Sequence, residues 1–366
     1  MKRTVLLNPG PVNVTERVRQ AQLKPDLCHR EQEFSDLMQS IRSKLVRVFG
    51  IASDFDAVLV TGSGTAALEM AVSSCLSERK SLLVIRNGVY GDRIAAMAEA
   101  YRFDTVCLDY AWGEAPQLND VKKALEQHPE IEVVALVHHE TTTGLLNPVH
   151  EIGELARKYS KRFLVDSVSG LAGDPLDFNR AGVDLCVGTA NKCLQGLPGV
   201  SFVLLRKTEP ARLEKIPGRS HYFNLYKNHQ AQEKGDTLFT PAVQVHYALD
   251  AALDELLEET VEGRIQRYRR AAELLRRGFQ DMGLEFIVPE THRSNTLTAL
   301  KLPEGVSYQW LHGKLKKKGF VIYAGQKKLS ETIFRIANMG DITTEEFQCL
   351  LDVLKKGLST STTPRD

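Results

Sequence analysis

Short apolar runs alternate with helix-like segments over the middle of the chain, from about residue 55 to residue 206. The runs are three to five residues long and rich in branched side chains, as buried strands are. They lie at residues 57–60, 82–85, 106–108, 133–137, 163–165, 185–187 and 201–205. Strand, turn and helix in repetition are typical of a mostly parallel sheet covered by helices on both faces. The sequence therefore predicts an α/β fold built on such a sheet.

The remainder of the chain predicts a second, smaller domain. Residues 242–283 carry apolar side chains at helical spacing without a proline, which indicates two helices or one long bent helix. Beyond them, residues 297–300, 320–323 and 333–336 are typical of strands in an α+β domain. We therefore divide the 366 residues into an N-terminal arm (1–15), a large domain (16–256), a small C-terminal domain (257–358) and a disordered tail (359–366).

The composition argues against several classes of function. Lys and Arg total 47 and Asp and Glu total 46, so the net charge is +1, which disfavours nucleic acid as the main partner. The first apolar run is too short for a signal peptide, and no apolar stretch approaches the ~18 residues of a membrane span. The 6 cysteines form no C-x-x-C pair and are expected to be reduced thiols. We expect a cytoplasmic protein with no membrane partner.

Two polar residues follow neighbouring predicted strands. Asp166 comes directly after the strand 163–165, and Lys192 follows the strand 185–187. Ligands of open parallel sheets bind at the carboxyl ends of the strands, so the two side chains are candidates for one site. A lysine can form a Schiff base with pyridoxal 5'-phosphate (PLP), and an aspartate can keep its pyridine nitrogen protonated. The pair by itself leaves open that both are ordinary surface residues.

A glycine-rich turn at residues 61–65 lies between a predicted strand and a predicted helix. Ser63, Gly64 and Thr65 can bring backbone N–H groups close to a phosphate at the N-terminus of that helix. An ordinary turn between strand and helix is an equal alternative, and the Gly-Lys-Ser/Thr of a nucleotide-binding loop is absent. Tyr90, in the turn after the next strand, can stack on a planar ring or simply pack on its own loop.

Polar residues also follow the predicted strand 133–137. Thr142 and Thr143 are candidate hydrogen-bond donors to a cofactor. The adjacent His138 and His139 suggest a metal at first sight, but neighbours on a strand point to opposite faces. No His-Glu-x-x-His pattern is present either, so we predict no metal site.

Arg335 lies inside the apolar predicted strand 333–336. A buried arginine needs an anionic partner, and its planar fork suits a carboxylate or a phosphonate. An internal ion pair with one of the chain's own acidic residues is the alternative.

With these residues in place, the chain resembles the class V aminotransferases. This PLP fold type I group includes alanine–glyoxylate and serine–pyruvate aminotransferases and cysteine desulfurases. Within it, the chain is most similar to the branch of 2-aminoethylphosphonate–pyruvate transaminases. The matching segments are residues 8–11, 62–65, 87–91, 140–148, 165–167, 190–196, 240–241 and 334–336. The resemblance implies fold type I, with a mostly parallel seven-stranded sheet in the large domain and a small α+β C-terminal domain.

The resemblance also implies roles for single residues. Lys192 would be the Schiff-base lysine and later the proton carrier, and Asp166 would pair with the pyridine nitrogen. Tyr90 would stack on the ring, and Arg335 would bind the acid group of each substrate in turn. The remaining contacts to PLP would come from Ser63, Gly64, Thr65, Thr142, Thr143 and Thr240. In the family the residue matching Thr240 reaches the phosphate from the partner subunit, which implies a homodimer.

The implied reaction moves the amino group of 2-aminoethylphosphonate to pyruvate and gives phosphonoacetaldehyde and L-alanine. Alternatives are an alanine–glyoxylate or serine–pyruvate type enzyme, a PLP lyase acting on a related aminophosphonate, and a catalytically silent PLP-fold binding module. Cysteine desulfurase chemistry is disfavoured because Cys349 lies in a helical pattern rather than a mobile loop. Three segments depart from the family pattern: Asn8 stands in place of a threonine, 324–326 in place of a Pro-Gly-Lys-like turn, and 28–31 differ from some members of the phosphonate branch.

Overall fold

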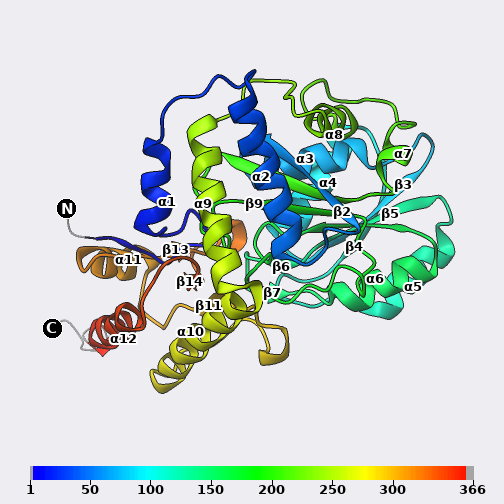
Figure 1. The fold of residues 1–366 in the computed structure, drawn as a ribbon. Coiled ribbons are helices and arrows are strands. Elements are labelled where there is room, and N and C mark those ends of the chain that lie inside the picture. Colours follow the sequence, from blue (N-terminus) through cyan, green and yellow to red (C-terminus); the bar gives the residue numbers. More distant parts are fainter. Residues whose placement is uncertain (1–2, 360–366) are drawn as a thin grey trace.

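The computed structural model describes residues 3–359 and is built around one large sheet (Figure 1). In order across the sheet, the strands are β2 (Phe55–Thr61), β10 (Val200–Arg206), β9 (Leu185–Thr189), β8 (Arg162–Asp166), β5 (Ile131–Val137), β3 (Ser81–Arg86) and β4 (Asp104–Asp109). β10 runs antiparallel to β2 and β9, and the other neighbouring pairs are parallel. The expected mostly parallel seven-stranded sheet is therefore confirmed.

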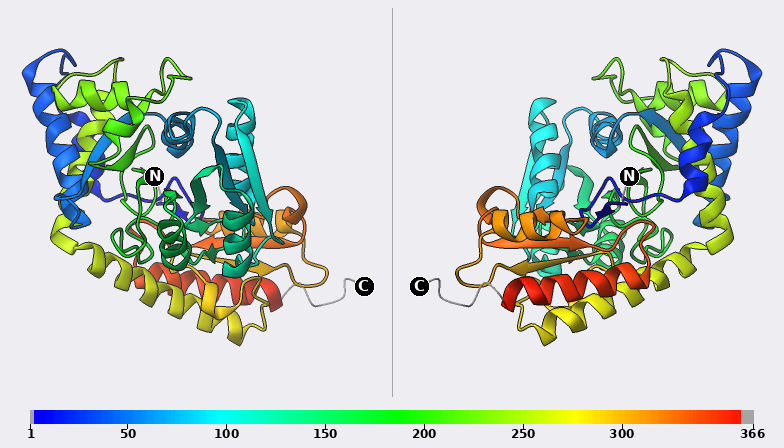
Figure 2. Two further views of the ribbon diagram at one scale, coloured as in Figure 1. Left: turned by 90° about the vertical axis from the view of Figure 1, so that its right-hand side faces the viewer. Right: turned by 90° about the vertical axis from the view of Figure 1, so that its left-hand side faces the viewer.

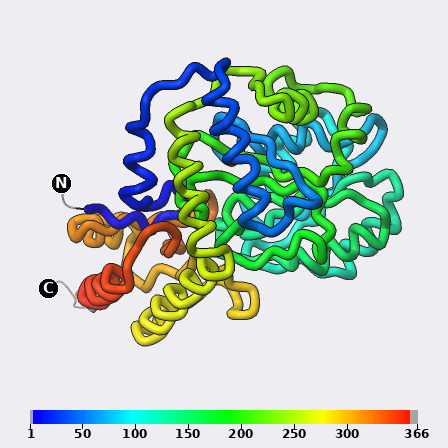
Figure 3. Tube along the Cα trace, viewed as in Figure 1, coloured from blue at the N-terminus to red at the C-terminus, as the bar shows by residue number. Residues whose placement is uncertain are grey.

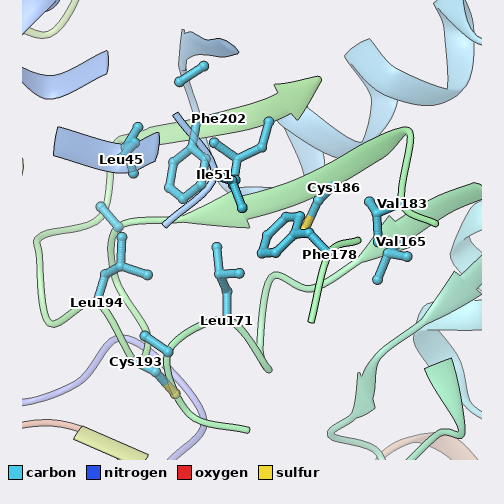
Figure 4. Close-up of a cluster of buried hydrophobic side chains, with 14 of the residues drawn as sticks. Leu45, Ile51, Val165, Leu171, Phe178, Val183, Cys186, Cys193, Leu194 and Phe202 are labelled. Carbon is cyan, nitrogen blue, oxygen red and sulfur yellow. The ribbon is translucent and has the colours of Figure 1, made fainter. Parts of the chain in front are cut away.

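Helices cover both faces of the sheet because side chains alternate along each strand. In β2, Val58 and Val60 belong to one buried cluster, whereas Ala57 and Leu59 belong to the other. The Val58 side is covered by α3 (Gly64–Ser74), α4 (Val89–Ala100), α7 (Pro210–Leu213) and α8 (Leu225–Glu233). The Ala57 side is covered by α2 (Gln32–Val48), α5 (Leu118–Gln127), α6 (Val149–Lys158) and α9 (Val243–Glu259). Figure 4 shows part of this second cluster, with Phe202 among its side chains.

The helical stretch after the sheet consists of two helices. α9 ends at Glu259, and α10 (Val261–Asp281) begins after Thr260. Thr260 breaks the helix because its φ is 68°, and its hydroxyl accepts a hydrogen bond from Gly263 N at 3.1 Å. Of the two arrangements expected from the sequence, two separate helices is the one observed, and Figure 2 shows α10 running away from the sheet toward the C-terminal part.

The C-terminal part is a small α+β unit with its own core. Its antiparallel sheet has the order β11 (Leu297–Lys301), β14 (Ile333–Ala337) and β13 (Tyr323–Ala324). It packs with α10, α11 (Tyr308–Lys317) and α12 (Thr344–Ser359) around a third apolar cluster. The predicted strand 320–323 is divided, because β12 (Phe320–Val321) pairs instead with β1 (Val5–Leu6) of the N-terminal arm. The N-terminal arm therefore packs against the C-terminal unit, as the tube in Figure 3 also shows.

Short elements complete the fold. They are α1 (Glu16–Gln20), the hairpin strands β6 (His139–Glu140) and β7 (Leu145–Leu146), and the 3₁₀ turns Ala21–Leu23, Glu290–His292 and Lys327–Leu329. No helix within residues 3–359 is long and apolar enough to cross a membrane. All 6 cysteines are free. The domain boundaries at 15, 256 and 358 stay predictions. Ser359, where the predicted disordered tail begins, is instead the last residue of α12, and the rest of that tail lies outside the described residues.

Candidate active site

The predicted site residues of the large sheet meet at its carboxyl edge. β2, β8 and β9 end there, and the loops that follow them enclose a cavity of about 140 Å³. Its lining consists of Ser63, Gly64, Thr65, Leu68, Tyr90, Arg93, Asp166, Val168, Thr189, Asn191 and Lys192. Six of these residues are predicted cofactor contacts, drawn from four separate segments of the chain. The structure thus brings together the lysine, the aspartate, the glycine-rich turn and the aromatic ring.

Lys192 lies in the loop after β9, with its side chain directed into the cavity. Only 8% of the residue is exposed, and its Nζ donates a hydrogen bond of 2.7 Å to Ser169 Oγ. The ring of Tyr90 lies 5.6 Å from the same nitrogen. The Lys192 amine is therefore held at a defined place, and Ser169 is a contact that the sequence analysis missed.

The N-terminal arm closes one side of Lys192. Gly10 has a φ of +101°, and a Cβ there would lie 3.1 Å from Lys192 Cγ, so a glycine suits both the backbone and the close approach. Asn8 stabilises this turn, because its Nδ2 donates to Pro11 O at 2.8 Å. Asn8, which stands where the family pattern has a threonine, thus helps to shape the turn beside Lys192.

Asp166 ends β8 and is buried at the base of the cavity. Burial raises the pKa of its carboxyl group, while the Val168 N–H and the cations of Lys192 and Arg93 act in the opposite direction. Its Oδ1 accepts a hydrogen bond of 3.0 Å from Val168 N, and within residues 3–358 no donor reaches Oδ2. A buried carboxylate with an oxygen left over fits a protonated ring nitrogen such as that of PLP.

The glycine-rich turn leads into α3 with an uncapped N-terminus. Ser63 occupies the N-cap position, yet its side chain makes no capping hydrogen bond. A Cβ on Gly64 would lie 2.7 Å from Val168 Cγ1, which explains why a glycine is needed at this contact. The Thr65 hydroxyl accepts a hydrogen bond of 2.9 Å from Arg93 Nη1. The free helix N-terminus, the hydroxyls and the arginine together suit a phosphate.

Tyr90 lies in the first turn of α4, close to the cations of Arg93 and Lys192. Arg93 Cζ is 4.7 Å from the centre of its ring, on the same helix one turn later. Burial alone would raise the pKa of Tyr90, but the positive charge of Lys192, a hydrogen bond with Thr141 and the positive charge of Arg93 together lower it below its ordinary value. Arg93 was not identified from the sequence, although its spacing from Tyr90 was available as a signal.

Thr142 and Thr143 are buried but do not line this cavity. The Thr142 hydroxyl donates to Glu140 Oε1 at 2.6 Å and accepts from Val89 N at 2.9 Å. It also lies 3.4 Å from Oε1 of Gln326. Residues 324–326, which depart from the family pattern, therefore contact the large domain here. The predicted contacts of Thr142 and Thr143 with a cofactor remain predictions.

Arg335 is a buried cation without a carboxylate partner. It lies in the middle of β14, where 2% of the residue is exposed. Its Nε donates to Ala324 O at 2.8 Å and its Nη1 to Thr141 O at 2.7 Å. No acidic side chain of residues 3–358 lies within 4.0 Å, so the internal ion pair considered above is not formed. Burial lowers the pKa of Arg335, while Tyr90 and Glu140 raise it.

Thr240 lies away from the cavity of its own chain. It is exposed, in the loop that precedes α9. Next to it, Phe239 stacks on Tyr222 with ring centres 4.3 Å apart, and Tyr222 and Leu238 are exposed apolar side chains. The proposed reach of Thr240 toward a partner subunit stays a prediction.

The paired histidines have separate hydrogen-bond partners. His138 Nδ1 lies 2.9 Å from Ser167 Oγ, and His139 Nδ1 lies 3.1 Å from Ser294 Oγ. Within the described chain, the group of side chains with metal-like spacing is instead Asp56, His229 and Glu233. That group is unsuited to a cation because Arg42 already pairs with its glutamate.

Comparison with known proteins gives consistent results. Residues 17–343 match the class V aminotransferase family. The chain is 37% identical to a 2-aminoethylphosphonate–pyruvate transaminase of Lysinibacillus sphaericus, over 97% of each chain. It is also 37% identical to an uncharacterized aminotransferase of Methanocaldococcus jannaschii, over 92% of this chain and 88% of the other. The structure is similar to that of alanine–glyoxylate aminotransferase from Nostoc sp., with a TM-score of 0.91 and 28% identity over 98% and 96% of the two chains.

Proposed function

The chain belongs to the class V aminotransferases, and on that basis we propose that it transfers the amino group of 2-aminoethylphosphonate to pyruvate. The products are phosphonoacetaldehyde and L-alanine, and the cofactor is PLP. The observation that carries the choice of substrates is Arg335, a buried cation that interacts electrostatically with Tyr90 and has no carboxylate partner within residues 3–358. Each of the two substrates carries an anionic group that can supply the missing charge.

The residues of the cavity fit PLP. Asp166 would hold the pyridine nitrogen, because one oxygen of its buried carboxylate meets no donor from residues 3–358. Ser63, Gly64 and Thr65 would hold the phosphate at the open N-terminus of α3, and Tyr90 would cover the ring. When bound, PLP supplies an electron sink that stabilises negative charge on the reacting carbon of the substrate.

Lys192 moves the proton in this proposal. With the amino donor in the site, its Nζ would accept a proton from the donor's amino-bearing carbon. Ser169 Oγ accepts a hydrogen bond from Nζ, and Gly10 borders the Lys192 side chain, so both keep the amine on one side of the cavity. With pyruvate, the same nitrogen carries the proton in the opposite direction.

Arg335 can serve both substrates in turn, because they occupy the site one after the other. Its Nε and Nη1 are held by the carbonyls of Ala324 and Thr141, which fixes the plane of the guanidinium. The rest of the fork remains available for a carboxylate or a phosphonate. Arginine suits this task better than lysine because its donors lie in one rigid plane.

We expect Arg335→Lys to weaken both half-reactions by about 10-fold to 100-fold in kcat/KM, as loss of charged hydrogen bonds of about 1.5–3 kcal/mol implies. Stopped-flow absorbance can follow each half-reaction separately, with 2-aminoethylphosphonate alone and then with pyruvate. Arg277→Lys is the control, since Arg277 is exposed on α10. Normal reaction of Arg335→Lys with both substrates would show that the anions bind elsewhere.

The choice of amino donor is tested with the unmodified protein. We expect 2-aminoethylphosphonate to convert the cofactor faster than alanine or serine does, and pyruvate to be consumed with formation of alanine. Faster conversion by alanine or serine, with glyoxylate as acceptor, would support the alanine–glyoxylate or serine–pyruvate alternative instead. Release of phosphate or another fragment without alanine formation would indicate a lyase.

We also propose that the protein is a homodimer in which Thr240 reaches the phosphate site of the partner subunit. The exposed Tyr222 and Leu238 beside Thr240 support an interface at this loop. We expect light scattering to give twice the 40.9 kDa chain mass, and Thr240→Ala to weaken PLP binding by about tenfold, the effect of one charge-assisted hydrogen bond.

The matched control for this prediction is Thr208→Ala. Thr208 is exposed after β10, at the opposite edge of the sheet. A fully active monomer at micromolar concentration would contradict the dimeric site, and unchanged PLP affinity in Thr240→Ala would contradict the role of that hydroxyl.

A further inference from the structure

A fully buried carboxylate, that of Glu140, closes the N-terminus of α4. Its Oε2 accepts hydrogen bonds from the backbone N–H groups of Tyr90 (3.1 Å) and Gly91 (3.2 Å). Its Oε1 accepts from the N–H of Thr142 (3.1 Å) and from the Thr142 hydroxyl (2.6 Å). That hydroxyl in turn accepts from Val89 N. The first three N–H groups of the helix are thus satisfied by two side chains from the segment after β5.

Each hydrogen-bond partner of Glu140 needs an acceptor, which both oxygens of an ionised carboxylate provide. All four groups around the carboxylate are donors, and the positive end of the helix dipole faces it. Within residues 3–358 no lysine or arginine forms an ion pair with it. The buried carboxylate is therefore held by hydrogen bonds from Thr142 and from the helix N-terminus, and removing it would leave several buried N–H groups without an acceptor.

From this geometry we propose that Glu140 is a positioning residue for the cofactor site, which acts by fixing the first turn of α4 and with it the ring of Tyr90. Tyr90 is the second residue of the helix, and its own N–H is one of those that Glu140 holds. The ring of Tyr90 lines the PLP cavity, whereas Glu140 does not. Glu140 therefore influences the cavity through the helix rather than by contact with a ligand.

The two helices that begin at this edge of the sheet, α3 and α4, differ in how their N-terminal N–H groups are satisfied. The N-terminus of α3 carries no side-chain cap and is open toward the cavity. The N-terminus of α4 is closed by Glu140 and Thr142. An anion such as the PLP phosphate is therefore directed to α3, while α4 serves as a rigid support for the aromatic ring.

Gly88 supplies independent evidence for the fixed place of Glu140. A Cβ on Gly88 would lie 2.3 Å from Glu140 Cδ and 2.4 Å from its Cγ. The φ of Gly88 is 177°, an extended value that any residue can adopt, so the backbone alone does not call for glycine. The space that a side chain would need at residue 88 is filled by the Glu140 side chain.

The first test measures the dissociation constant of PLP by titration into protein freed of cofactor. In metal sites, a residue that hydrogen-bonds to a ligand side chain typically contributes about 10-fold to 100-fold to metal affinity. By analogy, we expect Glu140→Gln to raise the PLP dissociation constant by a similar factor. The amide would place N–H donors against the donors of α4 or Thr142. Glu99→Gln, at the exposed end of the same helix, should leave the constant unchanged.

A double-mutant cycle separates positioning of Tyr90 from a general loss of stability. In a Tyr90→Ala background, Glu140→Gln should weaken PLP binding by less than about twofold, because residues that act through one another are not additive. Full additivity of the two changes would overturn the proposal. So would unchanged PLP affinity in Glu140→Gln.

Gly88→Ala provides a second route that leaves Glu140 in the chain. Its Cβ should displace the carboxylate and raise the PLP dissociation constant as Glu140→Gln does, with faster hydrogen exchange of the Tyr90 and Gly91 amides. In Glu140→Ala the obstructing atoms are gone, so adding Gly88→Ala should cause little further loss. Wild-type affinity in Gly88→Ala would overturn the inference even if Glu140→Gln failed to fold.

The inference rests on the assigned cofactor but not on the identity of the amino donor. If the unmodified protein does not bind PLP, the proposed function itself fails. If it binds PLP and Glu140→Gln binds it equally well, only the role of Glu140 is refuted.

Discussion

Replacing Lys192 by alanine should abolish transamination. Among residues 3–358 no other lysine lines the cavity, and the Lys192 amine is held there by Ser169 and the N-terminal arm. Proton transfer by a placed side chain contributes about 10²-fold to 10⁴-fold to a rate, and the loss of the covalent attachment adds to that. We expect kcat to fall by at least about three orders of magnitude, measured as alanine formed from 2-aminoethylphosphonate and pyruvate.

A readout independent of activity is available for the same variant. Borohydride treatment of the unmodified protein should fix the cofactor covalently to the peptide that contains Lys192, which mass spectrometry can identify. The purified protein should be yellow, and Lys192→Ala should lose both the covalent label and the absorbance band of the attached cofactor. Lys122→Ala, on the exposed face of α5, is the control. Labelling of a different lysine, or full turnover by Lys192→Ala, would refute the assignment.

Changing Asp166 to asparagine should preserve the fold and lower kcat by roughly two decades or more. The substitution keeps the size of the side chain and its bond from Val168 N, but it removes the negative charge at the base of the cavity. A charge-assisted contact of about 3 kcal/mol corresponds to that loss of rate. The amide cannot keep a ring nitrogen protonated, so the electron sink is weakened while much of the cofactor stays bound.

Two measurements decide the Asp166 prediction. Cofactor content, from absorbance after alkaline release, should remain high while steady-state kcat falls. Asp352→Asn is the matched control, because Asp352 is exposed on α12. A rate close to that of the unmodified protein in Asp166→Asn would mean that the aspartate has another task, and loss of all cofactor would mean that its contribution is to binding.

The sheet could be predicted because its strands are local features of the sequence. The apolar runs 133–137 and 163–165 became β5 and β8, since a buried strand needs branched apolar side chains on both faces. The prediction of a single strand at 320–323 was wrong. These four residues are alike in hydrophobicity, but the run is divided between two short strands that pair with different neighbours. β12 pairs with the N-terminal arm and β13 with β14, and nothing within the run marks that change of partner.

The site could be predicted only where a residue type is itself chemically distinctive. Lys192, Asp166 and the turn at Ser63 follow strands that share one edge of the sheet, and the structure brings them to one cavity. Arg93 and Ser169 carry no such signal, because their roles depend on contacts with Thr65 and Lys192 across the fold.

By itself, the sequence determined the class of fold, the order of its strands along the chain and the residues able to perform PLP chemistry, because periodicity and residue type are local properties. The tertiary structure alone decided which helix end is open and which is closed. Glu140 reaches the N-terminus of α4 from a segment about 50 residues later in the chain, and that contact exists only once β3 and β5 pair side by side. It also decided that Arg335 has no carboxylate partner within residues 3–358, since the absence of a carboxylate around a buried cation is a property of the packed molecule.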